Sequence, residues 1–169
     1  MKLFVEKIPD LHMLYIRELR LLLSAEEMIA IKMQALIDMA TDSDLHKTLR
    51  EHLEETEVHA ARLREILKRA GGETSPLKCR VVYALFDEAE DMMQDCAHLT
   101  VRNVALIAAV QRIEHYEIAA YGALRQFAWV MGLDDDAQLL DQSAREEERS
   151  DRQLTQVAER VDPSALKAA

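Results

Sequence analysis

The sequence predicts an all-α protein in which four long helices form an antiparallel bundle, with a short extra helix between the second and the third. Three observations support this class. Only 4 glycines and 3 prolines occur among 169 residues, and such a composition favours long helices. Apolar residues recur at every third or fourth position in four long segments, which is typical of helices with one face toward a core. Short polar breaks separate these segments in pairs, and short connections join antiparallel neighbours.

The first two long helices are separated by a break over residues 41–44. Pro9 and Asp10 suit the first turn of a helix, because proline lacks the amide hydrogen that would stay unbonded there and an acidic side chain complements the helix dipole. We therefore expect the first helix over residues 9–40. The break contains good N-cap residues, so the second helix should begin near Leu45.

A glycine-rich loop over residues 71–76 ends the second helix, and a shorter helix is expected over residues 78–97. Thr100 can cap the third long helix, which should end at Gly132. The connection over residues 71–99 is long enough to cross from one end of the bundle to the other. Two helical hairpins joined by one long crossover have the connectivity of ferritin-like proteins.

The fourth long helix should begin with the aspartates at 134–136, which cap and charge its start, and Pro163 should close it. The length of the chain suits one domain with a sizeable core. We therefore expect residues 1–169 to form a single ferritin-like helical domain whose core covers about residues 9–161.

Composition and charge argue against several function classes. The net charge is −10, from 31 acidic and 21 basic residues, which opposes nucleic acid as a partner. Arg62 and Arg64 are expected on solvated outer faces. No apolar run approaches the ~20 residues of a membrane span, and residues 1–6 lack the features of a secretory signal. Cys79 and Cys96 are too few for a disulfide framework, so a cytoplasmic protein is expected.

Acidic residues and histidines interrupt the four apolar stripes near their middles. The interrupting residues are Glu26, His52, Glu55, His59, Glu114, Glu117, Glu147 and Asp151. Carboxylates seldom stay buried unless they are paired or bind metal, and each uncompensated buried ion costs several kcal/mol. Six would approach the total stability of a domain, about 5–15 kcal/mol. A pair of metal ions would neutralise them, and oxygen-rich ligation with a little imidazole suits iron or manganese better than zinc.

Other interpretations stay open for the single residues. A glutamate such as Glu26 often lies at a helix edge with its tip in water, and one buried histidine is more often hydrogen-bonded in the core than bound to metal. Tyr121 is expected in the core or beside the site, and of residues 146–148 only Glu147 is in phase with the core face. The second hypothesis is therefore a metal-free structural or adaptor protein that acts through protein–protein contacts. A third is iron storage in a closed shell.

Four segments resemble the motifs of a known family. They are Ser24-Ala25-Glu26, His52-Leu53-Glu54-Glu55-Thr56, Glu114-His115-Tyr116-Glu117-Ile118-Ala119-Ala120-Tyr121-Gly122 and Glu146-Glu147. Together they resemble the YciF-like bacterial stress proteins, which belong to the ferritin-like, rubrerythrin-related superfamily. The resemblance extends from about Leu11 to Ala158. It implies a helical bundle, a homodimer, stress-related expression and a di-iron site.

The sequence departs from the rubrerythrin pattern at two histidines. Rubrerythrin-type helices carry E-x-x-H, which supplies a carboxylate and an imidazole from one helix face. Here Val58 and Ser150 stand at the expected histidine positions, so His52 or His59 would have to substitute. Two cysteines cannot form the four-cysteine iron domain of rubrerythrins, which implies that a reducing partner would be a separate electron donor.

We therefore expect a protein that binds a carboxylate-bridged pair of iron ions, with manganese as the alternative metal. Glu26 and Glu114 are the expected terminal ligands, and Glu55 and Glu147 the expected bridging ligands. Glu117, Asp151 and one histidine are expected to complete the site. Such a centre could oxidise ferrous iron or reduce peroxide and so protect the cell during stress. Whether it turns over as an enzyme stays open at this point.

Overall fold

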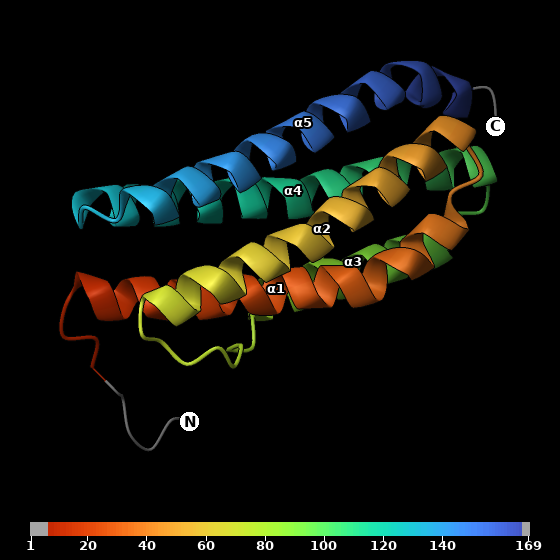
Figure 1. Cartoon of the computed structure of the whole chain (residues 1–169). Coiled ribbons are helices and arrows are strands. Elements are labelled where there is room, and N and C mark those ends of the chain that lie inside the picture. Colours follow the sequence, from red (N-terminus) through yellow and green to blue (C-terminus); the bar gives the residue numbers. More distant parts are fainter. Residues whose placement is uncertain (1–6, 167–169) are drawn as a thin grey trace.

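The computed structural model describes residues 7–166, which form five helices and no strand (Figure 1). The helices are α1 Leu11–Met39, α2 Ser43–Arg69, α3 Arg80–Asp95, α4 Leu99–Val130 and α5 Asp134–Ala165. Residues 1–6, on which the expectation about a secretory signal rested, and residues 167–169 lie outside the described part. None of the described helices has the length and apolar character that crossing a bilayer requires. The predicted all-α class is confirmed.

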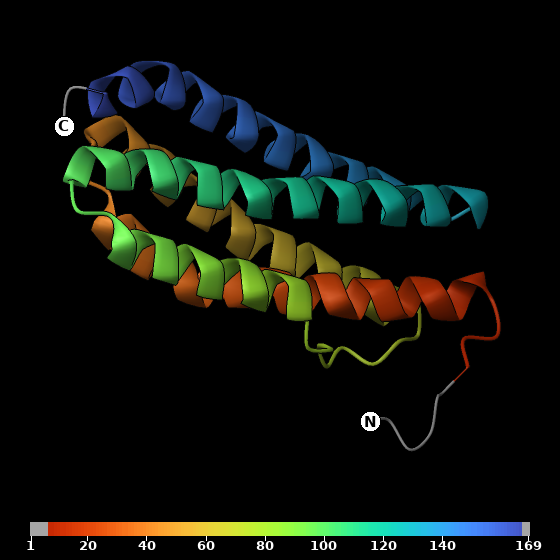
Figure 2. The same cartoon turned by 180° about the vertical axis from the view of Figure 1, so that it is seen from behind.

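The four long helices form two antiparallel hairpins, α1 with α2 and α4 with α5 (Figure 1). The hairpins pack with α1 beside α4 and α2 beside α5. The chain passes from one hairpin to the other through α3, which packs against α1 and α4 and lies outside them when the molecule is seen from behind (Figure 2). The structure is the predicted four-helix bundle with an extra helix in the crossover.

Aspartates cap the first two helices. Asp10 accepts the amide hydrogen of Met13 at 2.8 Å, as its place before the first helix predicts. Asp42 accepts two amide hydrogens of the first turn of α2, each at 3.1 Å, so this helix begins at Ser43, slightly earlier than expected. Two guanidinium nitrogens of Arg160 lie 2.7 Å from the Asp42 carboxylate. The far end of α5 is therefore tied to the turn between α1 and α2.

Two predicted helix boundaries are wrong. Thr100 does not cap α4, because the helix already begins at the residue before it, and the Thr100 hydroxyl is buried without a hydrogen-bond partner. Pro163 does not close α5, which continues to Ala165. Proline lacks one amide hydrogen and so removes one hydrogen bond, and only two residues of the helix follow it. The Ser164 hydroxyl supports the last turn by donating to a backbone carbonyl at 2.6 Å.

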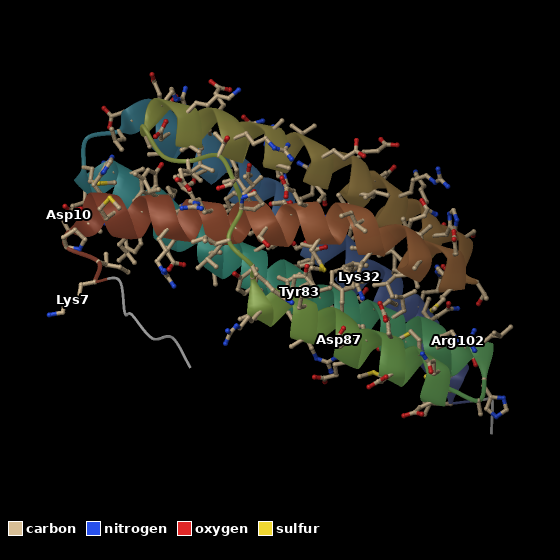
Figure 3. The ribbon with its side chains drawn as sticks, turned by 90° about the horizontal axis from the view of Figure 1, so that it is seen from below. Lys7, Asp10, Lys32, Tyr83, Asp87 and Arg102 are labelled. Atoms are coloured by element: carbon tan, nitrogen blue, oxygen red, sulfur yellow. The ribbon has the colours of Figure 1, made fainter. Side chains whose placement is uncertain are left out.

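Apolar and charged contacts hold α3 against the rest of the bundle. Phe86 is fully buried, and Ala89, one turn later, is almost so. Lys32 of α1 lies 2.6 Å from the Glu90 carboxylate and 3.9 Å from that of Asp87. Figure 3 shows Lys32 and Asp87 along the contact between the two helices. Helix α3 therefore covers the α1–α4 side of the bundle, and no described helix covers the α2–α5 side.

Candidate metal centre

Six buried carboxylate and imidazole side chains lie near the middle of the bundle, where each long helix is about half complete. They are Glu26 of α1, His52 and His59 of α2, Glu114 and Glu117 of α4, and Glu147 of α5. None is more than 1% exposed. Side chains three, four or seven residues apart share one helix face, which explains why α2 and α4 each contribute two members. The prediction that acidic residues of the stripes face the core is confirmed for Glu26, Glu114, Glu117 and Glu147.

The six side chains form two groups that share one carboxylate. His52, Glu114, Glu117 and Glu147 make up the first group, and Glu26, His59 and Glu147 the second; within each, one potential ligand atom from every residue lies within 4.8 Å of the others. The Glu147 Oε1 atom is 2.7 Å from His59 Nδ1, and its Oε2 atom is 3.7 Å from His52 Nδ1. One carboxylate with an oxygen directed to each group is the arrangement that bridges two cations.

Most of the polar atoms in this cluster have no hydrogen-bond partner. The buried atoms without one include Glu26 Oε2, His52 Nδ1 and Nε2, His59 Nδ1, Glu114 Oε2 and both carboxylate oxygens of Glu117 and Glu147. The close contact between His59 and Glu147 lacks the alignment of a hydrogen bond. Buried polar atoms are almost always satisfied in native proteins. Carboxylate oxygens and imidazole nitrogens are ligands of transition metals, so this donor set fits a pair of such ions.

Burial dominates the acid–base properties of the cluster. It raises the pKa of Glu26 and of Glu114 to about 8 and that of Glu147 to about 7. Burial also raises the pKa of Glu117 well above its usual range, and repulsion from the other three carboxylates adds to this effect. In the metal-free protein burial therefore favours the protonated form of these acids at pH values where exposed glutamates are ionised. A bound cation would replace those protons.

Hydroxyl groups hold two of the carboxylates from outside the cluster. Tyr121 is almost fully buried and donates a hydrogen bond to Glu26 Oε1. Ser150 donates to Glu114 Oε1 at 2.8 Å. Tyr121 thus lies beside the site, one of the two places that the sequence left open. Ser150 occupies the position where the rubrerythrin pattern has a histidine, and here it orients a carboxylate instead.

The structure does not bring Glu55 and Asp151 into the cluster. The Glu55 side chain is 33% exposed at the rim between α2 and α5, where it pairs with Arg149. Asp151 accepts a hydrogen bond from Gln111 at 3.0 Å and lies 3.5 Å from a ring nitrogen of His115. Both residues stand at the edge of the apolar stripe, where a carboxylate remains hydrated and can pair with surface groups. The bridging role expected for Glu55 is therefore not supported.

Glu146 and Arg62 are closer to the cluster than the sequence indicated. Glu146 Oε2 lies 2.9 Å from His59 Nε2, and the Arg62 guanidinium contacts both Glu146 oxygens. The two side chains are 18% and 17% exposed, so the prediction that both are solvated is wrong. Burial raises the pKa of Glu146, but hydrogen bonds from Arg62, Gln142 and His59 outweigh it and lower the pKa to about 2. One feature of the sequence could have indicated this placement of Arg62: it follows His59 by three residues and so lies on the same helix face.

Comparison with known proteins gives this chain a family. Residues 10–166 match the model of a family described as a domain of unknown function, DUF892. The chain is 32% identical over 136 residues to Protein YciF of Escherichia coli strain K12, an alignment that covers 80% of this chain and 82% of YciF.

Solved structures agree with this relationship. The crystal structure of the E. coli stress protein YciF matches with a TM-score of 0.88 and 29% identity over 92% of this chain and 99% of YciF. YcfI of Rhodopseudomonas palustris, a proposed structural protein, matches with a TM-score of 0.87 and 34% identity over 90% of this chain and 97% of YcfI. A protein of Xanthomonas campestris with 19% identity and a TM-score of 0.76 shares the fold. As its motifs predicted, the chain belongs to the YciF-like DUF892 family.

Proposed function

We propose that this YciF-like stress protein binds two metal ions, iron in the first place, at the buried cluster in the middle of the bundle. The observation that most strongly supports this proposal is the position of Glu147, which belongs to both potential ligand groups and has no hydrogen-bond partner for either oxygen. Glu147 would bridge the ions. His52, Glu114 and Glu117 would hold one of them, and Glu26 and His59 the other.

The charge and chemistry of the cluster fit this proposal. Four carboxylates and two imidazoles face one another, and two divalent ions would balance the four negative charges. Oxygen-rich sites with some imidazole suit iron and manganese. With Glu55 and Asp151 outside the cluster, six positive charges are not needed for balance. The site thus matches a pair of ferrous or manganous ions better than a pair of trivalent ions.

A bound iron pair would supply the electrons for reducing dioxygen or peroxide as ferrous iron becomes ferric. The residues of the chain provide the environment. Tyr121 and Ser150 hold carboxylates in place through hydrogen bonds. Leu22 and Ile29, one turn to either side of Glu26, are at most 1% exposed, so bulk water does not reach the core face of α1 beside Glu26. We propose ferrous oxidation or peroxide reduction as the activity of the site, with manganese as the alternative metal.

Metal analysis tests the proposal directly. Protein purified without chelator is analysed by mass spectrometry, and stripped protein is titrated anaerobically with ferrous iron and then exposed to oxygen. We expect two ions per chain and a ferric absorbance band. Glu147→Gln should lose at least one ion, whereas Glu148→Gln, whose exposed side chain pairs with Arg152, should keep both. Absence of bound metal in the unchanged protein, or full metal content in Glu147→Gln, would refute the proposal.

The second candidate is a metal-free structural protein, and the description of YcfI as a proposed structural protein favours it. In that case the cluster acids stay protonated and metal does not change stability. A ligand that binds only the folded state raises the melting temperature, so an equal melting curve with and without ferrous iron would favour this candidate. The cytoplasmic location, the homodimer and the separate electron donor stay predictions.

A further inference from the structure

We propose that Glu146 and Arg62 form a positioning pair that presents one ring nitrogen of His59 to the metal pair, so that the His59 half of the centre binds its ion more tightly than the His52 half. This inference rests on the proposed function. It adds an order of loading to the centre.

His59 lies between two carboxylates that contact opposite nitrogens of its ring. Nδ1 faces the cluster, 2.7 Å from Glu147 Oε1 and 3.7 Å from Glu26 Oε1. Nε2 faces away from the cluster, 2.9 Å from Glu146 Oε2. The ring is fully buried, so it cannot exchange either contact for water. Its orientation therefore directs Nδ1, and not Nε2, toward the space between the carboxylates.

Arg62 holds Glu146 beside the outer ring nitrogen of His59. Its guanidinium contacts both oxygens of Glu146 and also donates to Ser143 at 3.1 Å, while Gln142 donates to Glu146 Oε1 at 3.0 Å. These donors hold Glu146 Oε2 within hydrogen-bond distance of Nε2, where a carboxylate oxygen accepts from the ring N–H. With the Nε2 hydrogen directed at Glu146, the lone pair of Nδ1 is directed at the cluster. The carboxylate also makes the imidazole a stronger donor to metal.

His52 has no such partner. Among the described residues, neither of its ring nitrogens has a hydrogen-bond partner, and the nearest carboxylate oxygens are 3.5 and 3.7 Å from Nδ1. No outer group selects a tautomer for this ring, so metal binding must do so. Loss of an outer partner of a metal-bound histidine typically lowers affinity by about 10–100-fold. We expect the outer partner of His59 to strengthen binding in its half by about this factor, so that this half fills first although it has one carboxylate fewer.

The test is an anaerobic titration of the stripped protein with Co²⁺, followed by calorimetry and visible absorbance. The unchanged chain should bind two ions in two separate steps. Glu146→Ala should weaken the tighter step by about 10–100-fold and leave the weaker step unchanged. Arg62→Met should change the same step in the same direction. Glu148→Ala, an exposed neighbour on the same helix, is the matched control and should change neither step.

A double-mutant cycle separates positioning from a general structural role. In a His59→Ala background, Glu146→Ala should have no further effect on Co²⁺ affinity, because the imidazole that Glu146 contacts is absent. Failure of the unchanged protein to bind Co²⁺ would refute the proposed function itself. Two ions bound with equal affinity, equal weakening of both steps by Glu146→Ala, or an undiminished effect in the His59→Ala background would overturn the positioning inference and leave the metal centre intact.

Discussion

Replacing Glu117 by methionine should stabilise the metal-free protein and impair metal binding. Glu117 is fully buried, neither carboxylate oxygen has a hydrogen-bond partner, and the other three cluster carboxylates repel its charge. Methionine fills irregular core space with a flexible apolar chain of similar length. Apolar replacement of buried charged groups often stabilises a protein by about 1–4 kcal/mol.

The magnitude should lie in the lower half of that range, about 1–2 kcal/mol, because protonation already relieves part of the charge in the metal-free protein. For a chain of this size, 1 kcal/mol corresponds to about 2–4 °C in melting temperature. We therefore expect Glu117→Met to melt about 2–8 °C higher than the unchanged protein in the presence of a chelator. Metal at a hundred times its Kd would stabilise the unchanged protein by about 2.7 kcal/mol, or about 5–11 °C.

The assay is a pair of melting curves for each protein, one with chelator and one with anaerobic ferrous iron. Iron should raise the melting temperature of the unchanged protein more than that of Glu117→Met, because the variant lacks one ligand. Glu88→Met, at an exposed position of α3 far from the cluster, should respond to iron like the unchanged protein. If Glu117→Met melts lower without metal and gains as much from iron as the unchanged protein, Glu117 neither destabilises the empty cluster nor binds metal there.

Three further outcomes follow from the structure. The stability of the metal-free protein should fall as pH rises from about 4.5 to about 8. Glu26 and Glu147 keep their protons in the folded state up to a pKa of about 8 and about 7, whereas the unfolded chain loses them near its ordinary, lower values. Their protonation therefore contributes fully at low pH and is lost through that window; a flat or rising melting temperature in chelator would contradict this. Phe86→Ala should destabilise the protein by about 3–5 kcal/mol in urea unfolding, because it leaves a cavity where the buried Phe86 ring packs α3 against the bundle. A loss below 1 kcal/mol would show that this ring does not anchor α3. Gly132→Ala should cost about 1–2 kcal/mol, since Gly132 has φ of +71°; an unchanged melting temperature would mean that the turn relaxes.

The sequence was sufficient to predict the helices and the inward direction of most of the cluster. A helix repeats every 3.6 residues whatever surrounds it, so the stripes around Glu26, Glu114 and Glu147 identify the core face from local spacing alone. The acid cap at Asp10 and the glycine-rich loop after α2 are local signals in the same sense. Their effects depend on neighbours within one turn, which the sequence contains.

The edges of each helix face could not be assigned in this way. Glu55 and Glu146 both flank the apolar stripe, yet Glu55 pairs with Arg149 at the rim and Glu146 reaches His59. Which edge residue meets solvent and which meets another helix depends on how α2 and α5 approach each other. That approach is determined by side-chain packing along the whole contact.

The sequence by itself therefore determined the helical class, the family and the conflict between buried acids and an apolar core. Only the tertiary structure decided that Glu147 is shared by two groups, that Asp151 lies outside both, and that Arg62 supports His59 through Glu146. The physical reason is range. Periodicity is a property of one helix, whereas a distance between two side chains on different helices depends on the packing of every residue between them.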